Sequence, residues 1–283
     1  MVRFVGAGPG AADLITVRGM QYLKKADVVI YAGSLVHPGL LQYAPENARI
    51  FNSALMTLEE VMDVMVSAAE EGLEVVRLHT GEPSLYGAVR EQMDILDAHR
   101  IPYESCPGVS ACFGAAAGMN LEFTLPNVSQ TLIITRLAGR TSVPDREKMR
   151  LLASHQASMA IYLSAGMLGA LSEELCAGGY APHSPAALVY RATWPDEISV
   201  MCTVGTLEET GRRYGIRKTA LVLVGDVLHA RGEHAAGGKS PEAGTILPAG
   251  GEEDTADMPA AVYERSRLYS PDYSTQYRQA KED

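Results

Sequence analysis

The 283-residue sequence lacks the residue patterns that support metal, disulfide and serine-hydrolase chemistry. Its four cysteines form no C-x-x-C pair, and its seven histidines include no H-E-x-x-H and none beside cysteines at metal-ligand spacing. Gly-x-Ser-x-Gly is also absent. We therefore expect no metal centre, no disulfide framework and no hydrolase nucleophile. Cys106, which precedes a proline, is interpreted as a packed thiol.

Positive charge and long apolar runs are scarce as well. Lysine and arginine number 24 against 34 aspartates and glutamates, a formal net charge of -10, so the surface as a whole repels nucleic acid and anionic membranes. No apolar stretch approaches the length of a membrane span, and the N-terminus enters a glycine-rich motif without a leader. We expect a cytoplasmic protein in a reducing compartment, with no nucleic-acid or membrane partner.

Short β-branched apolar runs alternate with helical patterns up to about Gly225, which predicts an α/β fold. The length suggests two domains, and we place an N-terminal α/β domain at 1–122 and a C-terminal α/β domain at 123–230. A flexible acidic linker is expected at 231–259 and a tail at 260–283. Because no helical pattern separates the apolar runs on either side of residues 191–197, antiparallel pairing is expected in the second domain.

Two helices are predicted from local signals in the first domain. Thr57-Leu58-Glu59-Glu60 is a capping box, and the helix that it opens should end at Gly72. A second helix is expected over residues 15–25, with Leu14 and Leu23 pointing inward.

The glycine-rich stretch Gly6-Ala7-Gly8-Pro9-Gly10-Ala11 follows the first predicted strand and matches the loose dinucleotide pattern. Pro9 removes an amide that such a loop would direct at a phosphate, and the second strand ends in Tyr31-Ala32-Gly33, without a carboxylate for a ribose. We therefore interpret it as a tight strand-to-helix turn rather than a nicotinamide or flavin site.

Two further loops follow strands and precede helices. These are Thr80–Gly87 and Cys106–Ala111, both rich in small residues. Open α/β sheets bind ligands at the carboxyl ends of their strands, so two such loops at one edge favour a ligand site over ordinary turns. A third loop contains Arg136, Arg140 and Arg146; it is either a solvated surface loop or a site for carboxylates, the natural partners of guanidinium groups.

Together these residues resemble the tetrapyrrole methylases, which transfer methyl groups from S-adenosylmethionine. The resemblance covers nearly all of residues 1–230. It rests on the order and spacing of 5–10 with 13–16, 80–87, 107–111, 190–197, 204–207 and 220–227.

The resemblance implies two α/β domains with the cofactor in the cleft between them, bound largely through main-chain groups. The implied cofactor-binding residues are Pro9, Thr80, Gly81, Glu82, Ser110, Ala111, Leu163 and Ala192. Two of them depart from the common pattern, since Glu82 stands where aspartate is usual and Leu163 where methionine is frequent. Both changes keep charge or apolarity and so affect fine geometry rather than cofactor identity.

Within the family, residues 31–36, 125–141 and 266–271 are most similar to the branch that methylates C-11 of precorrin-4 in cobalamin biosynthesis. Methylation of another tetrapyrrole at a different carbon, such as uroporphyrinogen III or another precorrin, is the alternative. A carboxylate-rich substrate makes Arg136, Arg140 and Arg191 the expected anchors.

The implied chemistry needs alignment rather than a nucleophilic side chain, so no covalent intermediate is expected. Tyr86 and Glu82 are the candidates for a proton acceptor. The family's enzymes are commonly homodimers, and the presence of cobalt in the substrate is left open. A non-catalytic metabolite sensor and a nicotinamide oxidoreductase are the competing classes.

Overall fold

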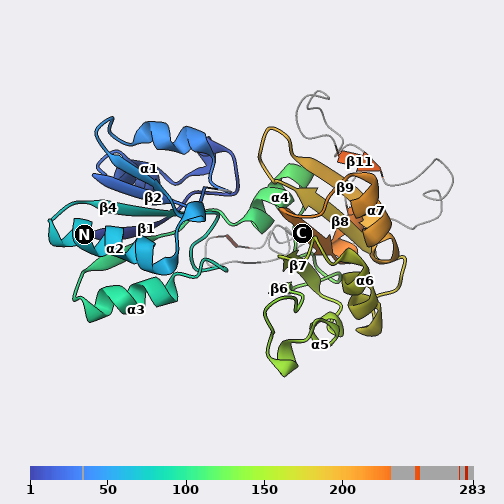
Figure 1. Cartoon of the computed structure of the whole chain (residues 1–283). Coiled ribbons are helices and arrows are strands. Elements are labelled where there is room, and N and C mark those ends of the chain that lie inside the picture. The colour runs from blue at the N-terminus through green and yellow to red at the C-terminus, as the bar shows by residue number, and fades with distance from the viewer. Residues whose placement is uncertain (34, 231–245, 249–273, 275–277, 280–283) are drawn as a thin grey trace. The chain divides into compact units, whose positions relative to one another are not determined.

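The computed structural model describes residues 1–33, 35–230, 246–248, 274 and 278–279. The chain forms two compact units, each with its own sheet (Figure 1): Met1–Gly114 together with Arg191–Pro195, and Ala115–Tyr190 together with the described residues from Asp196 onward. The α/β fold class is confirmed. The division at 122/123 stays a prediction, and the expected linker and tail lie almost wholly outside the described residues.

The first unit is built on a five-stranded parallel sheet. Its strands, in spatial order, are β3 (Arg49–Asn52), β2 (Val28–Tyr31), β4 (Val75–His79), β1 (Val2–Gly6) and β5 (Tyr103–Cys106). Because β1 lies between β4 and β5, the loops that follow these three strands emerge side by side at one edge.

Helices cover both faces of this sheet, and α1 is drawn on the opposite side from α2 and α3 (Figure 1). Alternate strand residues point to opposite faces. Phe4, Ile30 and Val75 pack with α2 (Leu58–Glu70) and α3 (Arg90–Ala98). On the other face, Val5, Val29 and Leu78 pack with α1 (Val17–Leu23) and the 3-10 helix Pro38–Tyr43.

One local prediction is confirmed and one is wrong in part. The Thr57 Oγ1 accepts a hydrogen bond from the Glu60 amide at 3.3 Å, the Glu60 carboxylate accepts one from the Thr57 amide at 2.7 Å, and Gly72 follows the helix with φ +78°. The helix expected over 15–25 begins later, because the Thr16 hydroxyl caps α1 by accepting from the Gly19 amide. Leu14 lies instead in the 3-10 turn Ala12–Leu14 and is 37% exposed.

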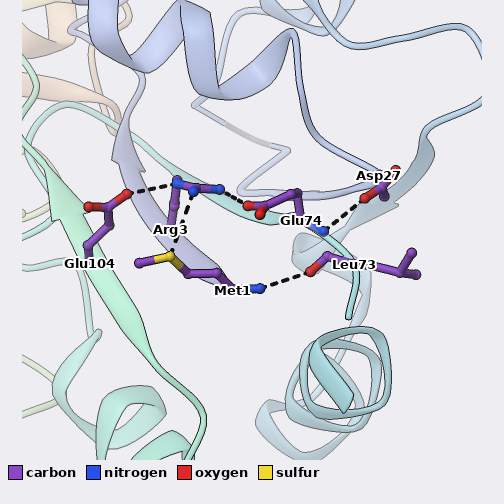
Figure 2. Close-up of polar contacts among 6 residues, drawn as sticks. All are labelled: Met1, Arg3, Asp27, Leu73, Glu74 and Glu104. Atoms are coloured by element: carbon purple, nitrogen blue, oxygen red, sulfur yellow. Dashed lines mark hydrogen bonds and ion pairs between the residues drawn. The ribbon is translucent and has the colours of Figure 1, made fainter. Parts of the chain in front are cut away.

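Ion pairs and hydrogen bonds of charged side chains connect the strands at the amino-terminal edge of the sheet (Figure 2). Arg3 pairs with Glu74, at the start of β4, and with Glu104 of β5 at 2.7 Å. The Glu74 amide donates to the Asp27 carboxylate at 2.9 Å beside β2. These contacts cross-link neighbouring strands at the edge opposite the three loops.

The second unit has a mixed sheet. In spatial order its strands are β11 (Ile246–Pro248), β9 (Ile198–Thr203), β8 (Pro185–Tyr190), β10 (Ala220–Val224), β7 (Ser158–Tyr162) and β6 (Leu132–Arg136). The expected antiparallel pairing is confirmed, with Tyr190 opposite Ile198 and both β8 and β7 antiparallel to β10. The helices α5 (Met149–Ala153), α6 (Leu168–Ala177) and α7 (Leu207–Arg213) cover one face. The helix α4 (Ala111–Met119) contains the division between the units.

Within the described part of the chain, no helix is long and apolar enough to cross a membrane.

Candidate functional site

Three loops of the first unit meet through backbone atoms at the carboxyl edge of its sheet. They follow β1, β4 and β5. A Cβ added to Gly6 would lie 2.5 Å from the Cα of Gly108 and 2.6 Å from the carbonyl oxygen of Gly81, and one added to Gly108 would lie 2.1 Å from that same oxygen. Only glycine lets the three loops approach this closely.

The amides of these loops are already engaged. Gly8 and Gly81 exchange hydrogen bonds, with the Gly8 amide donating at 3.3 Å and the Gly81 amide at 2.9 Å. The Gly108 amide donates to Glu82 Oε2 at 2.8 Å, and the Ser84 amide donates to Glu82 Oε1 at 2.9 Å. A dinucleotide site needs such amides directed at its phosphates, so this bonding supports the interpretation of the glycine pattern as a turn.

The carboxylate of Glu82 therefore ties the loop after β4 to the loop after β5. Burial acts to raise its pKa, but the hydrogen bonds from the Ser84 and Gly108 amides outweigh burial, and the pKa lies below its ordinary value. The group is ionised at neutral pH, and both of its oxygens accept hydrogen bonds. These contacts suit a residue that positions the loops better than one that accepts a proton.

A fourth segment joins the cluster from far along the sequence. Arg191–Pro195 follows β8 but belongs to the first unit. The Thr193 Oγ1 accepts a hydrogen bond from the Ala11 amide at 2.9 Å, and a Cβ added to Gly10 would lie 2.7 Å from the Ala192 carbonyl oxygen. The first turn of α4 also lies here, since a Cβ added to Gly114 would lie 2.8 Å from the Cβ of Pro9.

The structure thus gathers most of the predicted cofactor-binding residues. They come from four stretches of one unit, and they are Pro9, Thr80, Gly81, Glu82, Ser110, Ala111 and Ala192. Tyr86 lies in the same loop as Glu82, 44% exposed and with φ +57°.

The remaining predicted residues of the second unit share an edge of its sheet. Leu163 follows β7, is 67% exposed and has φ +54°, a conformation unusual for a branched side chain. The neighbouring Ser164 accepts a hydrogen bond at 3.0 Å from the Leu137 amide, which begins the arginine loop. The turn that carries Leu163 is therefore bonded to the loop that carries Arg140.

The arginines of this loop have different environments. The Arg136 guanidinium donates to the carbonyl oxygens of Thr141 at 3.2 Å and Ser142 at 2.7 Å, so it closes the loop on itself. Arg140 lies exposed within that closed loop. Of the two, Arg140 is the more exposed and therefore the more accessible to an external carboxylate, and Arg136 supports the loop.

Sequence reasoning missed a buried polar group behind the loop after β4. The Arg77 guanidinium donates to Gln92 Oε1 at 3.1 Å and to the Ile30 carbonyl at 3.2 Å, and Gln92 donates to the Ala88 carbonyl at 2.9 Å. These bonds link β4 to the end of the loop. The sequence signal for this network was the presence of two polar residues, Arg77 and His79, in the otherwise apolar strand β4.

Beside this network, the His79 ring is buried, and its Nε2 has no hydrogen-bond partner. Burial, and secondarily the charge of Arg77, lowers the pKa of His79 to about 3. The imidazole is therefore neutral at physiological pH.

Two observations concern other ligands. Among the described residues, no group of three or more histidines, cysteines, aspartates or glutamates is placed to hold a metal ion. A pocket of about 500 Å³ opens in the second unit where β8 ends, and the prediction named none of its residues. It is lined by Tyr190, Ile198, Tyr214, Gly215, Ile216, Arg217 and Lys218.

Comparison with known proteins finds relatives that cover most of the chain. The cobalt-precorrin-4 C(11)-methyltransferase of Methanocaldococcus jannaschii is 52% identical over 230 residues, which cover 81% of this chain and 89% of that protein. The precorrin-4 C(11)-methyltransferase of Pseudomonas aeruginosa is 44% identical over 231 residues, 82% of this chain and 92% of that protein.

Solved structures give the same result. A cobalt precorrin-4 methyltransferase of cobalamin biosynthesis superimposes with a TM-score of 0.79 at 43% identity, covering 80% of this chain and 95% of its own. The uroporphyrin-III C-methyltransferase of Thermus thermophilus, solved with S-adenosylhomocysteine, gives 0.68 at 27% identity, covering 80% and 98%. The model of the tetrapyrrole (corrin/porphyrin) methylases matches residues 1–208. The chain therefore belongs to the tetrapyrrole methylase family.

Proposed function

We propose that this protein is an S-adenosylmethionine-dependent C-methyltransferase that methylates C-11 of precorrin-4, or of its cobalt-containing form, to give precorrin-5. The observation that carries the proposal is the meeting of the three glycine loops with the Ala192 segment, at the positions where the resemblance to the family implies the cofactor. Identities of 44% and 52% to proteins named for this reaction support the choice of substrate.

The cluster fits the donor. A Cβ added to Gly81 would lie 3.7 Å from the Ala111 amide nitrogen, so the absence of a side chain leaves space in front of the start of α4. The Gly8, Gly81 and Gly108 amides near that space are bonded within the protein, so the space suits an adenosine better than a pyrophosphate, which needs amides directed at it. We propose that the donor contacts Pro9, Thr80, Gly81, Ser110, Ala111, Leu163 and Ala192.

The donor, when bound, supplies an electrophilic methyl group on a sulfonium sulfur. The residues of the chain therefore need only align this carbon with the nucleophilic ring carbon, and alignment alone supplies a large part of the rate. Glu82 keeps the loops in place through its two amide contacts. Tyr86 and Glu82 stay the candidates to accept the proton that the substrate finally loses; Tyr86 is 44% exposed, and both oxygens of Glu82 accept hydrogen bonds from loop amides.

Arg140 and Arg191 are proposed to anchor the peripheral carboxylates of the tetrapyrrole, with Arg136 supporting the loop of Arg140. Arg140→Ala should weaken tetrapyrrole binding by about 1.5–3 kcal/mol and leave the affinity for S-adenosylhomocysteine unchanged, because only a charge-assisted contact to the substrate is lost. Steady-state kinetics measures the first quantity and calorimetry the second. Arg150→Ala, at an exposed position of α5, is the control for loss of one charge. An unchanged KM for the tetrapyrrole would remove Arg140 from the anchors.

The function itself is tested with methyl-labelled S-adenosylmethionine and precorrin-4, followed by mass and carbon NMR analysis of the tetrapyrrole. One added methyl at C-11 is the expected result. A methyl at another carbon would confirm a C-methyltransferase but contradict methylation at C-11. That outcome is expected if the substrate is uroporphyrinogen III or another precorrin. Parallel reactions with and without cobalt in the substrate identify the form that is used.

We propose further that the protein is a cytoplasmic homodimer that needs no metal. Sedimentation equilibrium tests the dimer, and transfer activity after chelator treatment tests the independence from metal. The formal charge of -10 supports the absence of a nucleic-acid partner.

A further inference from the structure

The protein has a single tryptophan, Trp194, and it lies on the glycine-rich turn that follows β1. A Cβ added to Gly10 would lie 2.3 Å from the Cδ1 of Trp194, so the indole occupies the space that a side chain there would need. The adjacent Thr193 is bonded to the Ala11 amide. Gly10 is therefore explained by its contact with the indole rather than by a phosphate.

The indole contacts two other side chains of the first unit. The His37 ring centroid lies 5.2 Å from that of Trp194, and His37 Nδ1 accepts a hydrogen bond from the Gly39 amide at 3.0 Å, which fixes the imidazole. The Cζ of Arg191 lies 4.1 Å from the centroid of the indole. A guanidinium stacked in this way keeps the donors along its edge directed outward in the plane of the group.

The backbone of the segment is strained in a way that brings these groups together. Arg191 has φ +47° and Thr193 has φ +67°, left-handed values that are costly for a branched residue such as Thr193. The Trp194 amide donates to the Arg191 carbonyl at 3.0 Å, closing a turn that folds the guanidinium back over the indole.

We infer that Trp194 is a positioning residue for the tetrapyrrole: seated on Gly10 and packed against His37, it holds the Arg191 guanidinium in the orientation that receives a peripheral carboxylate of the substrate. The inference rests on the proposed function, which makes a carboxylate-rich macrocycle the substrate. It assigns a role to two residues, Trp194 and His37, that the cofactor and substrate predictions did not contain.

A double-mutant cycle tests whether Trp194 acts through Arg191. Trp194→Leu should raise the KM for precorrin-4 about 3- to 10-fold, with kcat and the Kd for S-adenosylhomocysteine within about 2-fold of wild type. Trp194→Phe keeps a ring and should recover most of the loss. In the Arg191→Met background, Trp194→Leu should add less than about 2-fold. Arg150→Met is the matched control for removal of a cation.

Two outcomes of the cycle would overturn the inference. Fully additive effects would mean that Trp194 does not work through Arg191. If Trp194→Leu weakened the affinity for S-adenosylhomocysteine as much as it raised the KM for precorrin-4, the indole would only maintain the fold of the segment.

A binding measurement separates failure of this inference from failure of the proposed function. The fluorescence of the lone tryptophan is titrated with uroporphyrin III, a stable tetrapyrrole with eight carboxylates. We expect saturable quenching, whether or not precorrin-4 is methylated. Arg191→Met should raise the Kd for uroporphyrin III at least 3-fold, and Arg150→Met should leave it unaltered. Equal Kd values for wild type and Arg191→Met would overturn the inference, and no quenching at all would overturn both it and the proposed substrate class.

Discussion

At the scale of single residues, His79 links the acidity of the medium to stability. Its folded pKa of about 3 lies below the value of about 6.5 for an unperturbed histidine, so between these pH values the unfolded chain binds a proton that the folded chain does not. The free energy of unfolding should therefore fall as the pH falls from about 6.5. In His79→Leu this contribution is absent, and the stability of the variant relative to wild type should rise by about 1–2 kcal/mol between pH 7 and pH 5.

Urea denaturation at pH 7, 6 and 5 measures this difference. His155→Leu, at an exposed position, is the control for removal of an imidazole. A stability gap between wild type and His79→Leu that stays constant over these pH values would show that His79 does not titrate far below its ordinary range in the folded protein.

The sequence predicted residues that the structure brings together, but it did not predict the hydrogen bonds that those residues make. Glu82 was predicted as a possible base, yet its carboxylate accepts hydrogen bonds from amides of two loops. These bonds form only because the two loops approach each other in the folded chain. Arg136 was expected to bind substrate, which stays a prediction, but its hydrogen bonds to two carbonyls of its own loop were not predicted. Spacing along a chain identifies a charged group near a site, but its hydrogen-bond partners depend on packing between distant segments.

At the scale of elements, the meeting of the loops after β1, β4 and β5 depends on glycine. Gly108→Ala would place a Cβ 2.1 Å from the Gly81 carbonyl oxygen, and backbone cannot move aside as a flexible side chain can. The variant should lose about 1–3 kcal/mol of stability and at least 10-fold in affinity for S-adenosylhomocysteine. Calorimetry and urea denaturation measure the two effects.

Gly166→Ala is the matched control, because its Cβ would meet no atom closer than 3.4 Å. Equal affinity in wild type and Gly108→Ala would mean that this loop contact does not shape the cofactor site.

Elements were predictable here wherever a local signal existed, as for the capping box at Thr57. The strand Arg49–Asn52 was missed because none of its residues is buried and it contains only two successive apolar residues, Ile50 and Phe51.

At the scale of the whole molecule, the relatives indicate how much of the chain the activity requires. About 230 residues of this chain account for 89–92% of the length of two precorrin-4 methyltransferases, and the residues of the proposed cofactor site lie within residues 6–195. A chain that ends at residue 250 keeps β11 and should bind S-adenosylhomocysteine within 2-fold of the full chain. A loss beyond 5-fold in calorimetry would show that the C-terminal residues contribute to the site.

The first unit is not one continuous stretch of sequence, since Arg191–Pro195 returns to it after the chain has entered the second unit. During synthesis, a ribosome that has finished residue 114 has made the whole parallel sheet but not the segment that seats on Ala11 and Gly10. The glycine turn therefore lacks this contact while about 80 further residues are made, which takes roughly 4–16 seconds at typical translation rates. In the order of synthesis, the first unit is therefore completed only after β6, β7 and β8 of the second unit have been made.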